Sequence, residues 1–366
     1  MSKSYSQWRA MLAVTKGSMR AILRSPSAII FGIGFPLIFI VVFGLLGSTS
    51  PVLKIAFAPD SDTANAMYRM LQSDRNIKVV EKPYTALQNE LTKGRITAIL
   101  RIVKMPEGVM PKYRLELQSS TASVDRISML QSALREMIAV LDAAAATQQN
   151  HFAEIKQLPM IQGRIYRSID FILPGQLGFS LLSSGVFGVA FLFFNLRNQL
   201  ILKRFFATPI RRAYIVFGEG ISRVAFGMLT AVVILLAGHF IFKFTLVNGM
   251  LTFLELLLLS VIGLIVFMGF GFVVSGLAKN ESTIPPFANL VTLPQFLLSG
   301  TFFSIENFPT WLQPLCNALP LTHLNNAMRN IAFEGAHLYQ CGTELAVLLA
   351  WGIGIYALAV RVFRWE

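Results

Sequence analysis

Few side chains in this sequence have the types and spacing that enzyme chemistry requires. Asp60 and Asp62 stand two residues apart, where paired carboxylates can bind a cation, although such a pair is more typical of a solvated turn. No G-x-S-x-G nucleophile motif and no G-x-x-x-x-G-K-[ST] phosphate-binding loop occurs. The four histidines show no metal-ligand spacing; they are His151, His239, His323 and His337. We therefore expect no catalytic residue, no metal site and no cofactor bound by this chain.

Three other side chains are chemically notable. His239 lies in an apolar stretch, where an ionisable group is a candidate for function, but a neutral histidine near a helix end more often serves packing. Cys316 and Cys341 fall in one predicted segment. They can form a disulfide in an oxidising compartment or remain two buried thiols, because the sequence gives no distance between their Cα atoms. Both alternatives stay open at the level of sequence.

The distribution of charge indicates a membrane protein. Apolar residues make up 54% of the 366 positions and charged residues 14%, against about a quarter in soluble domains. No charged residue occurs between Arg24 and Lys54. The net charge of +13 would indicate a nucleic-acid partner for a soluble protein, whereas in a membrane protein it reflects basic cytoplasmic loops that face anionic lipid. We expect the lipid bilayer, and no nucleic acid, as a partner.

Six uncharged windows are near or above the length needed to cross the hydrocarbon core of a bilayer, allowing for tilt and for snorkelling at their ends. They are residues 25–53, 171–196, 224–242, 256–278, 282–305 and 345–360. Arg223 and Arg361 stand at window edges, where their stems can reach the interface. The predicted fold class is a polytopic α-helical membrane protein with six transmembrane helices, one plus five, and an α+β extracytoplasmic domain between the first and the second. The expected ranges are 1–25 for a cytoplasmic amphipathic helix, 26–49 for the first span, 50–169 for the extracytoplasmic domain and 170–363 for the remaining spans.

Basic residues in the short connecting segments predict the orientation. One set is rich in Lys and Arg: residues 1–24 with five, 195–215 with five, 278–282 with one and the C-terminus with two. The opposite segments, 243–250 and 304–343, have one basic residue each. Because Lys and Arg accumulate on the cytoplasmic side, both termini are expected in the cytoplasm and residues 50–169 outside.

Patterns in the polar parts predict local structure. Residues 5–23 mix apolar and basic side chains, which favours an interfacial amphipathic helix over a disordered basic leader. The insert predicts a small α+β domain in the order strand–helix–strand–helix–strand–strand–helix. Its strands are expected at 52–58, 77–80, 95–103 and 113–118, and its helices at 64–71, 84–92 and 123–149.

Two segments within the block of five spans are unusual. Residues 196–209 alternate apolar and basic side chains at helical spacing before Pro209, which predicts a short amphipathic helix on the cytoplasmic face; an ordinary basic connector is the alternative. Pro294 and the Ser299–Gly300 pair interrupt the fifth window, and short broken apolar pieces follow. Because irregular backbone at membrane depth must be covered by protein or line a cavity, we expect a re-entrant segment at 304–343 on the outer side.

These segments resemble those of ABC-2 type transporter permeases. Residues 203–209, Lys-Arg-Phe-Phe-Ala-Thr-Pro, look like the family's L-x-x-L-L-x-T-P segment. Residues 294–309 resemble its P-x-x-x-L-S-G-x-F-F-P-x-x-x-x-P segment, and residues 320–329 resemble L-P-L-T-x-x-x-x-x-x-R. The one-plus-five layout is similar to that of the drug- and lipid-exporting members, so the resemblance covers residues 5–363. Two departures are Asn198–Ile201, where the family often has Glu-x-Gly-Thr, and Ser304, where proline is common.

The resemblance implies a permease subunit of an ATP-driven ABC exporter, which is not itself an enzyme. It would move a lipophilic or amphiphilic substrate, such as a drug or a lipid, out of the cytoplasm or inner leaflet of a bacterial inner membrane. ABC ATPase subunits would bind the ATP, a second permease copy or a paralogue would complete a dimer, and a periplasmic adaptor stays open as a further partner. ATPase coupling would fall to Leu202, Lys203, Arg204, Phe205, Phe206, Thr208 and Pro209. An extracellular gate or re-entrant segment would be formed by Pro294, Ser299, Gly300, Pro309, Pro320 and Arg329.

Two other function classes fit a membrane protein with an external domain. An ion-coupled secondary transporter would show inverted repeats and carboxylates at mid-membrane, whereas Glu219 and Glu255 stand near window ends. A non-transporting membrane protein with a partner-binding external domain would need no shaped cytoplasmic loop. Co-purification of an ATPase distinguishes a permease from both.

Overall fold

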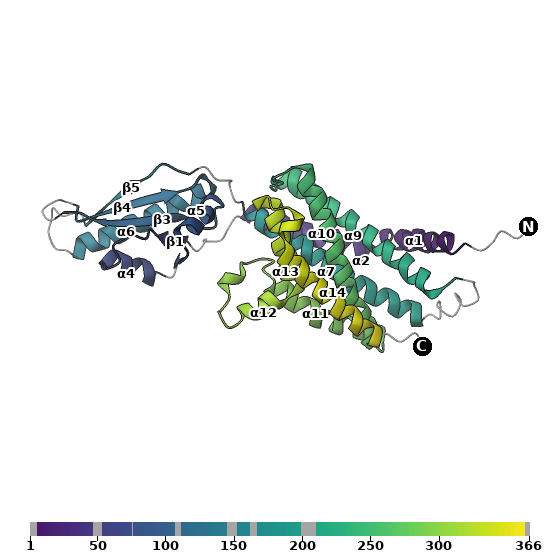
Figure 1. Ribbon diagram of the computed structural model, residues 1–366. Coiled ribbons are helices and arrows are strands. Elements are labelled where there is room, and N and C mark those ends of the chain that lie inside the picture. The colour runs from purple at the N-terminus through teal and green to yellow at the C-terminus, as the bar shows by residue number, and fades with distance from the viewer. Residues whose placement is uncertain are drawn as a thin grey trace, which may run out of the picture. The chain divides into compact units, whose positions relative to one another are not determined.

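The computed structural model describes residues 6–46, 53–74, 76–106, 111–144, 152–161, 167–198 and 210–362. The chain divides into two compact units, which are treated separately below. One is Ser48–Arg167, and the other combines Met1–Gly47 with Ser168–Glu366. In Figure 1 the first unit contains strands and helices, and the second contains helices.

The unit Ser48–Arg167 is a mixed sheet with helices. Its strands are β1 (Leu53–Phe57), β2 (Ile77–Val79), β3 (Ala98–Lys104), β4 (Tyr113–Ser119) and β5 (Ala153–Gln157). Its helices are α4 (Ala66–Ser73), α5 (Tyr84–Thr92), the 3₁₀ turn Thr121–Ser123 and α6 (Val124–Ala144). The strand order is β2-β1-β3-β4-β5, with β3 and β4 antiparallel and the other neighbours parallel.

Alternation along β4 builds the core of this unit. Tyr113, Leu115 and Leu117 are buried while the intervening residues are partly exposed, and they pack with Leu130 and Leu134 of α6. The predicted order of strands and helices agrees with these elements. The fifth strand was not predicted, because the sequence of β5, Ala-Glu-Ile-Lys-Gln, is short and polar and only its first residue is buried.

The second unit is entirely helical over its described residues. Its N-terminal helices are α1 (Gln7–Leu23), α2 (Pro26–Ile29), a π-helical turn (Ile30–Gly34) and α3 (Phe35–Leu46). The long helices are α7 (Ser168–Asn198), α9 (Arg212–Phe242), α10 (Met250–Leu277) and α14 (Gly342–Val362). Shorter ones are α11 (Ile284–Leu298), α12 (Gln313–Ala318), α13 (Pro320–Arg329), the π turn Asn330–Glu334 and the 3₁₀ turns Glu281–Thr283, Ile305–Asn307 and Leu338–Gln340.

Four helices are long and apolar enough to cross a membrane: Ser168–Arg197, Ala213–Phe242, Met250–Leu277 and Gly342–Val362. The other two predicted spans are shorter as described. The first contributes the apolar helix Gly32–Val42, and the fifth contributes α11, whose 15 residues end at Leu298. The described residues thus support a helical membrane protein, and the count of six spans stays a prediction.

Helix α7 lies at the centre of this unit. It packs against α3, α9, α10, α11 and α13. Small residues allow its closest approach to α10, because a Cβ on Gly185 would lie 2.9 Å from the Cβ of Phe267. Helix α14 is peripheral, with 17% of its apolar window buried against 61% for α7 and α10. A movement of α7 would therefore be transmitted to most of the helices around it.

The first apolar segment is held to α7 at its π-helical turn. A π turn shifts the backbone hydrogen bonds and exposes a carbonyl to other donors. The hydroxyl of Ser180 on α7 donates to the carbonyl of Gly32 over 2.6 Å, in a buried position. This bond and the packing of Gly32 against Phe226 of α9 fix where the segment turns.

Candidate functional site

The predicted coupling segment falls largely outside the described residues. Of 196–209, the structure describes the last residues of α7, and Leu202, Lys203, Arg204, Phe205, Phe206, Thr208 and Pro209 are not described. The helices that flank the segment in the sequence are described: α7 ends at Asn198, and α9 begins at Arg212. Its helical form and its role stay predictions.

The two other motif segments meet at one place, the α7–α11–α13 junction. We define this junction as Phe171, Gly175, Gln176 and Gly178 of α7, Ser299–Thr301 after α11, and Asn325 and Arg329 of α13. Helix α11 contains Pro294 and ends at Leu298 with Ser299 as its C-cap, and Gly300 follows with φ +67°, a left-handed conformation that favours glycine. The Ser-Gly pair thus serves as the turn that directs the chain away from α11.

Arg329 links all three parts of the junction. Its Nε and Nη2 donate to the carbonyl of Phe171 over 3.2 and 3.0 Å, and Nη2 also donates to the carbonyl of Gly300 over 2.6 Å. The guanidinium stacks on the Phe171 ring with its Cζ 3.8 Å from the centroid. A planar fork with several donors is needed for this combination, which lysine does not offer.

Amide side chains supplement these bonds. Asn325 Nδ2 donates to the carbonyl of Ser299 over 3.1 Å. At the N-terminus of α13, where Pro320 occupies the first helical position, the backbone N–H of Leu321 donates to Gln295 Oε1 of α11 over 3.4 Å. The end of α11 is therefore bonded to both ends of α13.

Glycines bring α7 into close contact with these segments. A Cβ on Gly175 would lie 2.9 Å from Thr301 Cα, and a Cβ on Gly178 would lie 2.9 Å from Leu321 Cδ1 and would overlap the Asn325 side chain. Such distances are shorter than real Cβ contacts, so no larger residue fits either position without a shift. The junction is closely packed.

Several polar atoms are nonetheless buried at the junction without a bond. Gln176, fully buried, has no hydrogen-bond partner among the described residues for Oε1 or Nε2, and the same holds for Ser299 Oγ, Thr301 Oγ1 and Asn325 Oδ1. Burying an amide without a partner costs free energy. Among the described residues, these polar atoms are therefore the uncompensated part of the junction.

The gate residues predicted from sequence divide into two groups. Ser299, Gly300 and Arg329 belong to the junction, and Pro320 is buried at the start of α13. Pro294 and Pro309 are exposed. Gln176, Asn325 and Phe171 were missed; a glutamine inside an otherwise apolar window was the signal that could have indicated the first.

The remaining candidate residues have structural roles. Cys316 and Cys341 are free and buried, so the structure has two thiols at these positions. A ring nitrogen of His239 is bonded to the carbonyl of Phe244 over 3.1 Å, as a packing histidine would be. Asp62 accepts from the N–H of Ala64, and Asp60 pairs with Arg101. Among the described residues no group of His, Cys, Asp or Glu could hold a metal ion.

A second contact joins the amphipathic helix α1 to α9, and Figure 1 shows the two helices side by side. Ser18 Oγ donates to Glu219 Oε1 over 2.5 Å, and Thr15 Oγ1 donates to the carbonyl of Gly218 over 3.0 Å. Trp8 packs edge-on against Tyr214. Tyr214 belongs to the first turn of α9, which begins at Arg212.

The model of the ABC-2 family of transporter proteins matches residues 26–361. The chain belongs to this family. The resemblance to ABC-2 type permeases is thereby confirmed, and the family is one of membrane permeases whose general partners are ABC ATPases.

Three relatives illustrate the range of this ABC-2 family. ABC transporter G family member 20 of Dictyostelium discoideum is 28% identical over 195 residues, which cover 52% of this chain and 26% of that protein. The probable multidrug ABC transporter permease YbhR of Escherichia coli (strain K12) is 23% identical over 168 residues, 46% of this chain and 45% of that protein. Linearmycin resistance permease protein LnrN of Bacillus subtilis (strain 168) is 22% identical over 191 residues, 51% of this chain and 48% of that protein. The alignments span less than half of each relative.

Proposed function

We propose that this chain is the membrane-spanning subunit of an ATP-driven exporter for a lipophilic or amphiphilic substrate. Family membership and the four apolar helices support a transport subunit. The names of two relatives, a probable multidrug permease and a linearmycin resistance permease, support the substrate class. The subunit would lie in a bacterial inner membrane with both termini in the cytoplasm, paired with a second copy or a paralogue.

The observation that carries the proposal is the course of α7. Its first turns form the junction with α11 and α13, and its last residues, 196–198, begin the predicted coupling segment 196–209. A helix of 31 residues is about 46 Å long, enough to cross a bilayer and extend beyond it. One rigid element would thus connect the site of ATPase docking with a closed contact at the other end of the span.

The mechanism follows from this connection. ATPases on separate chains would bind ATP and displace the coupling segment, since this sequence has no phosphate-binding loop of its own. Helix α7 would move with the segment and separate Gly175 and Gly178 from the α11–α13 turn. The uncompensated polar atoms of Gln176 and Asn325 would then meet water or substrate, which lowers the cost of opening.

The decisive experiment is co-purification from native membranes. The tagged chain is expected to bring down an ABC ATPase, with substrate-stimulated, vanadate-sensitive ATP hydrolysis in the complex. Phe205→Asp should abolish the association, because a charge would replace a docking phenylalanine, while Phe205→Leu should preserve it. Export and ATPase binding at wild-type level in Phe205→Asp would refute the coupling role, and absence of any ATPase from the wild type would refute the exporter.

A further inference from the structure

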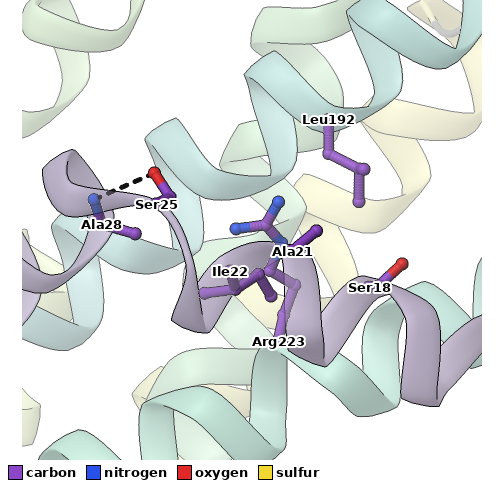
Figure 2. A pocket seen from close by; sticks show the side chains of 7 residues that line it. All are labelled: Ser18, Ala21, Ile22, Ser25, Ala28, Leu192 and Arg223. Carbon is purple, nitrogen blue, oxygen red and sulfur yellow. Dashed lines mark hydrogen bonds between the residues drawn. The ribbon is translucent and has the colours of Figure 1, made fainter.

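A cavity of about 200 Å³ lies between the N-terminal helices and the spans α7 and α9. Figure 2 shows its lining, which consists of Ser18, Ala21, Ile22, Ser25, Ala28, Leu192 and Arg223. Four of the seven side chains are aliphatic and one is a cation. Liquid water takes about 30 Å³ per molecule, so the space exceeds that needed for a few ordered waters. An apolar wall with a single cation is an unusual lining for a cavity that holds water alone.

The guanidinium of Arg223 reaches into this space with unused donors. Its Nε is buried and has no hydrogen-bond partner among the described residues. Gly188 of α7 leaves room for it, because a Cβ there would lie 3.0 Å from Nη1. In Figure 2 the group lies between Ser25 and Leu192. A guanidinium whose buried Nε has no acceptor among the described residues is the kind of group that an anionic ligand would satisfy.

One carboxylate influences this cation. Glu219, one turn earlier on α9, attracts Arg223 electrostatically, but its Oε1 takes the hydrogen bond of Ser18 and its Oε2 has no partner among the described residues. Glu219 therefore weakens the attraction of Arg223 for an anion without occupying its donors. Removing the charge of Glu219 should strengthen anion binding.

The position of the cavity along the helices indicates where the anion comes from. Arg223 directly precedes the uncharged window 224–242, and Ser25 directly precedes the first apolar segment. Both residues thus lie at the same membrane interface, where phosphates of lipids meet acyl chains. A guanidinium next to aliphatic side chains complements a molecule in which a phosphate is attached to an apolar group.

We propose that this cavity binds the phosphate-bearing headgroup of an anionic phospholipid. Arg223 holds the phosphate, and Ala21, Ile22 and Leu192 contact the glycerol and the first methylenes. Inorganic phosphate shares the contact with the guanidinium but gains nothing from the apolar wall. Because α1, the α1–α2 turn, α7 and α9 all line the cavity, the lipid fastens the N-terminal helix to the spans. The site does not depend on the identity of the exported substrate.

The test titrates dioleoyl phosphatidylglycerol into the purified full-length protein and counts bound lipids by native mass spectrometry. The wild type should retain one lipid more tightly than the others. Arg223→Gln should weaken this lipid about tenfold or more, since a charge-assisted bond is lost. Glu219→Gln, whose amide can still accept from Ser18, should strengthen it. Arg24→Gln, which removes an exposed charge at the end of α1 outside the cavity, should leave it unchanged. Equal binding by the wild type and Arg223→Gln overturns the proposal.

Three further measurements separate the alternatives. Dioleoylglycerol, which has the same chains without phosphate, should not occupy the tight site, and equal binding of it would show that the cavity takes acyl chains alone. Millimolar inorganic phosphate should not displace the phosphatidylglycerol, and full displacement would assign the site to free phosphate. Should Arg223→Gln fail to fold, Ala28→Leu fills the cavity with the cation intact, and tight binding in this variant would place the lipid elsewhere.

Discussion

The α7–α11–α13 junction and the α1–α9 contact join helices of the same unit in different ways. At the junction, Gly175 and Gly178 allow α7 to pack so closely that no side chain would fit, and Arg329 donates hydrogen bonds to two carbonyls. Along α1 and α9, Thr15 and Ser18 each donate one hydrogen bond and Gly218 brings α9 close to Met11, but a cavity separates another part of the two helices. Closely packed helices can separate only as a whole, whereas helices with a cavity between them can shift gradually. The difference favours the junction as the two-state element.

The largest expected effect is at Arg329. Arg329→Gln removes the charged fork from the carbonyls of Phe171 and Gly300 and should lower the free energy of unfolding by roughly 3 kcal/mol, at about 1.5–3 kcal/mol per charged bond. Thermal unfolding in detergent, followed by circular dichroism, measures the loss. The exposed Arg20 of α1 supplies the control, since Arg20→Gln should change stability by less than about 0.5 kcal/mol. Similar losses in both variants would remove the contrast between the two regions.

A glycine pair gives the next largest effect. Gly175→Ala forces the backbone at Thr301 to shift and should cost about 1–3 kcal/mol of stability, the usual range for overpacking. Gly17→Ala on α1 meets no atom within 4 Å and should stabilise the helix by up to about 1 kcal/mol. Unfolding midpoints of the two variants test both signs. An unchanged unfolding midpoint in Gly175→Ala would mean that the junction has room for a methyl group.

The third prediction concerns the hydrogen bond between Ser18 and Glu219 in the α1–α9 contact. Ser18→Ala leaves both oxygens of Glu219 without a partner and should cost about 1–2 kcal/mol. The loss should appear as faster proteolysis within α1, while the unfolding of the spans changes little. Ser18→Thr retains a hydroxyl and is the matched control. Equal protection of α1 in Ser18→Ala would show that the apolar contacts alone hold this helix.

The burial of the cysteine thiols can be tested by their reactivity in the unsubstituted protein. Burial raises the pKa of the Cys341 thiol to about 11, with Glu344 and Glu255 adding to the shift. Near pH 8 the thiolate fraction is then about a hundredfold below that of an ordinary cysteine, so alkylation should be correspondingly slow and should accelerate as the pH approaches 11. Mass spectrometry under non-reducing conditions follows the reaction. A chain that takes up two alkyl groups only after reduction would have a disulfide in place of the free thiols.

Sequence patterns predicted the helices and strands better than the tertiary contacts between them. The apolar windows and the Ser299–Gly300 interruption follow from local rules, because charge, proline and glycine act on their own segments. Arg329 was identified through its motif, although its bonds to Phe171 depend on a residue 158 positions away. Gln176 and Asn325 were missed, since a polar residue in an apolar window has no meaning until its neighbours are known. The sequence placed Arg223 at the edge of an apolar window, but its packing against Gly188 and its place in the cavity lining beside α1 could not be predicted.

The late position of β5 in the chain has a consequence for biosynthesis. Strand β4 is complete at Ser119, but its parallel partner Ala153–Gln157 is synthesised only after α6, shortly before the second apolar segment begins at Ser168. Until then the growing insert presents an unpaired strand edge, which is a template for pairing with other chains. The sheet closes only when translation has nearly reached α7. Premature arrest between these points would therefore yield an aggregation-prone nascent chain.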